Sequence, residues 1–159
     1  MSELIIRPAR KEDIRGMLKL IKELAEFEHG LNQVTVTEDE LLKDGFGANP
    51  IYQCIVAEAG TQLSGIAVYF YSYSTWNGKC LYLEDLIVSK DSRFGGVGSK
   101  LMTELIRIAQ KEKVKRMSWQ VLDWNLDAQD FYRKFEAQLD SEWLNGRLDE
   151  DQINNFKTE

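Results

Sequence analysis

Two adjacent acids, Glu84 and Asp85, stand between the apolar triplets LYL and LIV in the run LYLEDLIV, residues 81–88. Acids with apolar neighbours suggest a function more strongly than acids in a charged stretch, because charged residues are seldom buried without a partner. Side chains alternate along a strand, which predicts that the two carboxyls point to opposite faces and that only one faces a ligand. A carboxylate there can attract a cation and accept its proton. The alternative is a pair of solvated strand acids.

The glycine-rich stretch RFGGVG, residues 93–98, has a composition suited to binding a phosphate. It joins a strand pattern to a helix pattern, where the first N–H groups of the helix lack helical partners and can point at an anion. Glycine permits close approach, and Arg93 adds a permanently charged planar donor. The dinucleotide fingerprint G-x-G-x-x-G is absent, because Leu101 stands where the third glycine belongs, and no P-loop G-K-[ST] follows. A turn that merely joins strand to helix is the alternative.

The surrounding sequence predicts the elements that position these two segments. Residues 52–59, 64–73 and 80–88 are rich in β-branched and aromatic residues, which predicts three antiparallel strands. From residue 96 to about residue 113, apolar residues recur at helical spacing and form a stripe that can cover a sheet. The two acids are therefore expected on a strand, and the glycines where that strand leads into a helix.

The rest of the chain continues the alternation of strands and helices. Residues 4–7 predict a short strand ended by Pro8, and apolar residues at helical spacing predict a helix from Ile14 to about Glu28. Thr37 and Glu40 form a capping box that opens a second helix. This helix should stop at Asp44-Gly45. The remaining predicted elements are a strand at 116–122, a helix starting near Asn125, a short strand near 137–140 and a further strand at 143–148. This order indicates an α/β domain with a mixed sheet.

Composition restricts the class of protein. A chain of 159 residues with 43% hydrophobic content has the size of one domain, residues 1–159. The sequence shows no signal-peptide pattern and no apolar run long enough to cross a bilayer, so we expect a cytoplasmic protein with no membrane partner. A formal charge of −6 opposes nucleic-acid binding and suits a cationic small molecule. Cys54, Cys80 and the single histidine, His29, give no pattern for a disulfide framework or a metal site.

Four segments together resemble a known family. R-x-x-G-x-G between a strand and a helix is similar to the acetyl-CoA pyrophosphate loop of the GNAT superfamily of N-acetyltransferases. FEHGLNQVTVTEDELLKDGFG, YLEDLIV, RFGGVGS and DWNLDAQDFYRKFEA, in this order, resemble its diamine (spermidine/spermine) N-acetyltransferase group, which includes thialysine-acetylating relatives. The resemblance covers roughly residues 4–140 and implies a single GNAT-like α/β domain with a mixed central β-sheet and helices on both faces. Glu136-Ala137 departs from the family's Gly-Ala, and Ser74-Thr75 from its acidic residue before Trp76.

The resemblance implies acetyl-CoA as co-substrate, no metal, and a set of residues that bind the coenzyme. The backbone of Leu86, Ile87 and Val88 would pair with the pantetheine arm as an added strand, which requires the strand at 80–88 to splay from the strand at 116–122. The other implied coenzyme contacts are Arg93, Phe94, Gly95, Gly96, Val97, Gly98, Ser99, Asn125 and Ala128.

For the amine, the resemblance implies a channel that ends at a carboxylate. Glu84 matches that carboxylate, and Phe27 and Glu28 match positions that contact the substrate. The alternative for these two is a core aromatic and a surface acid. Trp76 could offer a cation–π face to the amine, or lie exposed in a dimer contact.

The chemistry requires a proton acceptor and a proton donor. An alkyl ammonium has a reference pKa near 10.4, so on the order of one molecule in a thousand is a free amine at pH 7. We expect Glu84 to remove that proton through water, and the backbone N–H of Leu86 or its neighbour to stabilise the oxyanion. Tyr132, at the position where the family has its acid, would protonate the leaving thiolate. The alternative for Tyr132 is a core aromatic.

The leading hypothesis is an N-acetyltransferase that acts on a primary amine of a small cationic substrate: a polyamine, a diamine or a thialysine-like amino acid. Acetylation of a lysine or N-terminus of a protein is one alternative. An acyl-CoA-binding regulatory module without catalysis is the other. The family usually forms a homodimer, and the resemblance implies one here.

Overall fold

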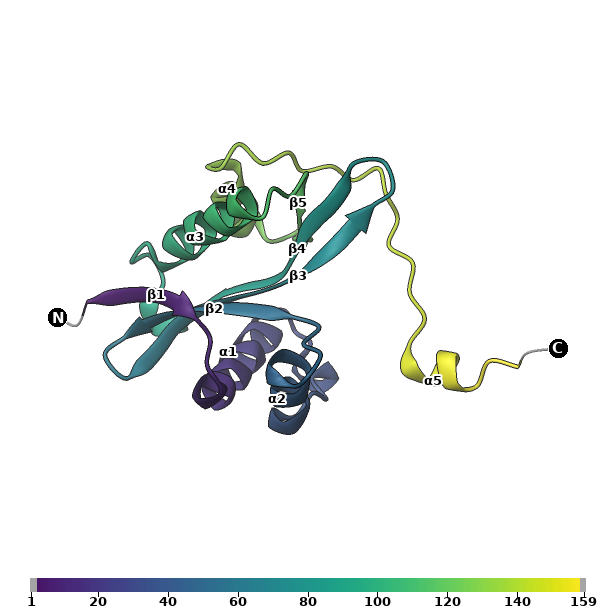
Figure 1. The fold of residues 1–159 in the computed structure, drawn as a ribbon, viewed down its shortest axis with the longest axis horizontal. Helices are drawn as coiled ribbons and strands as arrows, with labels where there is room; N and C mark the ends of the chain where they lie inside the picture. Colours follow the sequence, from purple (N-terminus) through teal and green to yellow (C-terminus); the bar gives the residue numbers. More distant parts are fainter. Residues whose placement is uncertain (1–2, 158–159) are drawn as a thin grey trace. The chain divides into compact units, whose positions relative to one another are not determined.

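The structure is a computed structural model that describes residues 3–157, and its centre is a five-stranded sheet with the strands in chain order (Figure 1). β1 to β4 pair antiparallel, and β5 pairs parallel with β4, so the sheet is mixed. The strands are β1 (Leu4–Pro8), β2 (Gln53–Ala59), β3 (Gln62–Ser74), β4 (Gly78–Val88) and β5 (Met117–Ser118). The first four confirm the predicted strands. β5 is two residues long where seven were predicted.

Helices α1 (Ile14–Phe27) and α2 (Glu38–Phe46) cover one face of the sheet (Figure 1). The apolar stripe of α1 packs against strand residues that include Val56, Ile66 and Ile87. The predicted capping box is present, because Thr37 Oγ1 accepts from the Glu40 N–H at 3.2 Å and the Glu40 carboxylate accepts from the Thr37 N–H at 2.8 Å. α2 continues to Phe46, past the predicted stop.

Helix α3 (Val97–Lys111) covers the other face of the sheet (Figure 1), so the prediction of helices on both faces is confirmed. Its buried stripe includes Leu101 and Leu105, both fully shielded from solvent. Gly65 of β3 makes this contact close, because a Cβ there would lie 2.7 Å from the carbonyl oxygen of Ile87 and 3.0 Å from Leu101 Cδ1. A larger residue at this position would clash with the backbone of β4 and press against Leu101 of α3.

The described residues divide into two compact units, one up to Gln120 and one from Val121. The second unit contains α4 (Leu126–Arg133), which confirms the predicted helix near Asn125, and α5 (Glu150–Asn154), which was not predicted. The strands predicted at 137–140 and 143–148 are wrong, because neither segment is a strand. Strand propensity has an effect only where a neighbouring strand is available, and Trp143 and Leu144 are 83% and 96% exposed.

Within residues 3–157, none of the helices combines the length and apolar content that spanning a bilayer requires.

Candidate active site

β4 carries one extra residue at Glu84. Tyr69 pairs with Leu83 and Val68 pairs with Asp85, so Glu84 has no partner on β3 and forms a β-bulge. The regular alternation of side chains, from which we predicted opposite directions for the two acids, is therefore interrupted between them. Asp85 is half-buried and lies opposite Val68, on the face that α1 covers, whereas Glu84 is exposed. The bulge thus places two carboxyls with different surroundings on consecutive residues.

The carboxyls of Glu28 and Glu84 lie close enough to the carboxyl of Asp85 to influence its pKa. Burial, together with the negative charges of Glu84 and Glu28, raises the pKa of Asp85 to about 6. Glu28 directly follows α1 and is exposed overall, yet neighbouring atoms desolvate its carboxyl and raise its pKa. None of the three forms an ion pair with a basic side chain within residues 3–157. A bound cation would relieve this uncompensated charge.

The glycine loop provides open backbone N–H groups. Phe94 and Gly96 have left-handed φ angles of 65° and 76°, and Gly96 is the N-cap of α3. The first helical hydrogen bond runs from the Lys100 N–H to the Gly96 carbonyl oxygen at 3.1 Å, so the N–H groups of the three residues between them have no partner within the helix. A Cβ at Gly96 would meet no atom within 4 Å. This open helix end fits a phosphate group.

The edge of β4 is available for a further strand. β4 pairs with β5 only at Leu81–Met117 and Tyr82–Ser118. From Leu83 to Val88, that side of β4 has no strand partner within residues 3–157. This is the splay that binding of the pantetheine arm to residues 86–88 requires.

The end of α1 lies against the loop that precedes α3. The guanidinium carbon of Arg93 is 5.1 Å from the centroid of the Phe27 ring, a cation–π geometry. Lys90 Nζ forms an ion pair with Glu26 at 3.0 Å, and the Lys90 backbone N–H points at Glu23 Oε2 at 3.4 Å. The structure therefore brings Phe27 together with Arg93, and Glu28 and Glu84 close to Asp85.

Trp76 does not join this group of side chains. It lies in the turn between β3 and β4 and is 92% exposed. Glu84 lies six positions after Gly78 along β4, a rise of roughly 20 Å. Within this chain Trp76 does not border the carboxyls. Its side chain gives the turn between β3 and β4 a large exposed aromatic surface.

In the second unit, the predicted residues lie on α4. Asn125 is the N-cap, and its Oδ1 accepts from the Ala128 N–H at 3.2 Å, so these two residues form the start of the helix. Tyr132 lies two turns further along. It is 8% exposed, and its ring contacts that of Phe131 at 5.2 Å between centroids in an edge-on arrangement.

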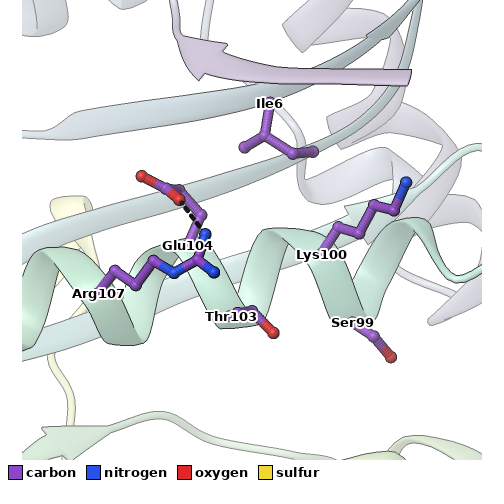
Figure 2. A pocket seen from close by; sticks show the side chains of 6 residues that line it. All are labelled: Ile6, Ser99, Lys100, Thr103, Glu104 and Arg107. Carbon is purple, nitrogen blue, oxygen red and sulfur yellow. Dashed lines mark hydrogen bonds and ion pairs between the residues drawn. The ribbon is translucent and has the colours of Figure 1, made fainter. Parts of the chain in front are cut away.

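A cavity of about 470 Å³ lies away from the carboxyls, between β1 and α3. Figure 2 shows Ile6 of β1 above the side chains of α3, with an ion pair between Glu104 and Arg107 at 3.4 Å. Among the predicted site residues, only Ser99 borders it. Neither Glu84 nor Asp85 lines this cavity.

The three carboxyls are not arranged to hold a metal ion. Within residues 3–157, no group of three or more His, Cys, Asp or Glu side chains has a suitable geometry.

Comparison with known proteins assigns the fold to a family. The family model described as "Acetyltransferase (GNAT) family" matches residues 17–136. The chain belongs to the GNAT acetyltransferase family. It is 39% identical over 146 residues to a thialysine N-epsilon-acetyltransferase of Bos taurus, covering 87% of this chain and 86% of the relative. It is 37% identical over 134 residues to the spermidine/spermine N(1)-acetyltransferase-like protein 1 of Homo sapiens, covering 80% of this chain and 19% of that protein.

Solved GNAT structures share the architecture. An aminoglycoside N-acetyltransferase in complex with CoA superposes with a TM-score of 0.74 at 18% identity, covering 93% of this chain and 96% of that one. At this identity the likeness shows the fold alone. The predicted family, GNAT fold and acetyltransferase activity are confirmed, and GNAT acetyltransferases use acetyl-CoA.

Sequence reasoning missed the importance of Asp85, which it placed on the opposite face from the ligand. The deciding features are its register with Val68 and the charges of Glu84 and Glu28. The sequence contained one signal of this role. Asp85 is directly followed by the apolar residues LIV, and it lies two positions from Ile87, so the two side chains share one face of the strand.

Proposed function

We propose that this protein transfers the acetyl group of acetyl-CoA to a primary amine of a small substrate with more than one positive charge: a polyamine, a diamine or a thialysine-like amino acid. One observation carries the proposal, namely that the carboxyls of Glu28 and Glu84 lie near that of Asp85 and that none of the three has a basic partner among residues 3–157. A polycationic amine supplies the missing positive charge. The names of the bovine and human relatives support this substrate class.

The carboxyl pair at the bulge acts on the proton of the bound ammonium. A carboxyl with a pKa of about 6, as burial gives Asp85, is about nine tenths ionised at pH 7. In this proposal Glu84 receives the proton through water, and Asp85 holds the second positive charge of the substrate near it.

The glycine loop and the free edge of β4 bind the coenzyme. Arg93 and the open N–H groups after Gly96 hold the pyrophosphate, with Phe94, Gly95, Val97, Gly98 and Ser99 forming the rest of the loop. The backbone of Leu86, Ile87 and Val88 pairs with the pantetheine arm. Acetyl-CoA supplies an activated thioester.

By the family resemblance, residues of α4 complete the reaction. Asn125 and Ala128 contact the coenzyme, and Tyr132 donates a proton to the departing thiolate. A phenol with a reference pKa near 10 stays protonated during amine attack and can still protonate a thiolate, whose reference pKa is near 8.5.

The test is release of free thiol from acetyl-CoA in the presence of diamines, polyamines, thialysine, lysine and lysine-containing peptides. We expect release with the polycationic small amines and thialysine. Release only with peptides would favour protein acetylation. Tight coenzyme binding without thiol release with any amine would favour a regulatory module and overturn the proposal.

A further inference from the structure

The C-terminal turn of α1 contacts both halves of the proposed site. On one side the Phe27 ring lies 5.1 Å from the guanidinium carbon of Arg93, at the start of the glycine loop. On the other side Glu28, the next residue, lies close enough to Asp85 to raise the pKa of that carboxyl. Two consecutive residues thus connect the loop that fits a phosphate with the carboxyls that suit an amine.

The Phe27–Arg93 contact has a defined cost if it is lost. Both side chains are exposed, Phe27 by 38%, and a cation–π contact at an exposed site contributes about 0.5–1 kcal/mol, or roughly a two- to fivefold effect on an affinity. The nearby Lys90–Glu26 ion pair is also exposed, and pairs of this kind contribute little. Of these two contacts, the one with the aromatic ring is the one that involves the guanidinium of Arg93.

We propose that Phe27 is a positioning residue that couples coenzyme binding to amine binding. Its ring holds the positive charge of Arg93 beside the end of α1, where that charge repels a cationic amine approaching Glu28 and Asp85. The coenzyme pyrophosphate neutralises Arg93 and removes this repulsion. Each ligand therefore increases the affinity for the other by the same factor, as thermodynamic linkage requires. The inference rests on the proposed function.

The experiment measures the Kd of coenzyme A by titration calorimetry, with and without saturating spermidine or thialysine, at constant ionic strength. Coenzyme A lacks the acetyl group, so no reaction occurs. For the wild-type protein we expect the amine to lower the Kd about fivefold or more, within the usual range of coupling between sites.

Three variants separate positioning from general damage. Phe27→Leu removes the aromatic face, and we expect a two- to fivefold weaker affinity for coenzyme A. The effect of the amine on that affinity should then fall to less than twofold. Phe27→Tyr keeps the aromatic face and should retain both the wild-type affinity for coenzyme A and the wild-type effect of the amine on that affinity. Glu26→Gln removes the Lys90 ion pair without touching the ring and should leave the effect of the amine unchanged.

The outcomes distinguish this inference from the proposed function. If wild-type protein binds coenzyme A and amine without mutual effect, or if Phe27→Leu retains the wild-type effect, the inference is overturned and the proposed function stands. If the wild-type protein binds neither ligand, the proposed function fails and the inference with it. A circular dichroism spectrum of Phe27→Leu that matches wild type confirms that the comparison concerns folded protein.

Discussion

Replacing Asp85 with asparagine should make the protein more stable at neutral pH and less active. The carboxyl has a pKa of about 6 in the folded chain and an ordinary value of 3.8, because burial and the charges of Glu84 and Glu28 disfavour its ionised form. Folding therefore opposes ionisation of this group. Asparagine has nearly the same shape and carries no charge, so it removes that opposition.

The size of the effect follows from linkage. A difference of two pKa units corresponds to about 3 kcal/mol, which is the largest gain in the free energy of unfolding that Asp85→Asn can give. Below about pH 4 the carboxyl is protonated in both states, and wild type and variant should differ little on this account. Between about pH 4 and 6 the folded state binds more protons than the unfolded state, so wild-type stability falls relative to the variant as pH rises. Above about pH 6 the difference should stay constant.

Urea unfolding of both proteins from pH 4 to pH 8 measures this difference. Asp13→Asn is a control for which we expect a change of stability of the opposite sign. Burial alone would raise the pKa of the Asp13 carboxyl, but this carboxyl accepts hydrogen bonds from the Arg7 guanidinium and from the Arg10 backbone N–H, each at 2.7 Å, and its pKa is lowered. The free energy of unfolding of Asp13→Asn should be lower than that of wild type by about 3 kcal/mol or more at pH 7. This difference should shrink only as the pH falls below the usual pKa of an aspartate.

The reasoning would be refuted by an Asp85→Asn variant whose stability relative to wild type does not change between pH 4 and pH 8. A variant that gains stability and retains the full rate of acetyl transfer would instead show that Asp85 is desolvated but not used.

Three further substitutions test individual parts of the site. Arg93→Ala should weaken coenzyme A binding by tenfold or more while changing turnover at saturating acetyl-CoA much less, because the loop binds a part of the coenzyme that does not react; calorimetry and steady-state rates measure the two effects. Glu84→Gln should bind coenzyme A normally but lower the rate with cationic amines by about 10² to 10⁴, with loss of the low-pH limb of the rate profile. Tyr132→Phe should melt within a few degrees of wild type, bind coenzyme A comparably and turn over at least tenfold more slowly.

Each of these substitutions has a contrary result. Unchanged coenzyme affinity in Arg93→Ala would remove the loop from coenzyme binding. A wild-type pH profile in Glu84→Gln would remove that residue from proton transfer. A large loss of stability, or a full rate, in Tyr132→Phe would make Tyr132 a packing residue.

The sequence predicted the elements whose patterns are local. The stripes of α1 and α3 repeat with helical period, and each buries its stripe against one face of the sheet. Thr37 and Glu40 predicted the start of α2 because a capping box needs only residues three positions apart. The antiparallel strands β2, β3 and β4 were predicted because short turns keep their partners close in sequence.

Features that depend on distant partners could not be predicted in this way. The bulge at Glu84 exists only in the register of β4 against β3, and the sequence of β4 alone does not contain that register. The apolar residues at 137–140 and 143–148 have strand-like composition but no partner strand, so composition alone predicted strands that do not form. The raised pKa of Asp85 likewise depends on burial and on Glu28, which is far away in the sequence.

The central claim, that the carboxyls select an amine with a second positive charge, is tested most directly by two substrates with the same four-carbon chain. We compare kcat/KM for 1,4-diaminobutane and for 1-aminobutane, which lacks the second ammonium group, by thiol release from acetyl-CoA. We predict that wild-type protein prefers the diamine by tenfold or more, and that Asp85→Asn combined with Glu28→Gln removes most of this preference. Equal kcat/KM values for the two amines in the wild-type protein would contradict the account.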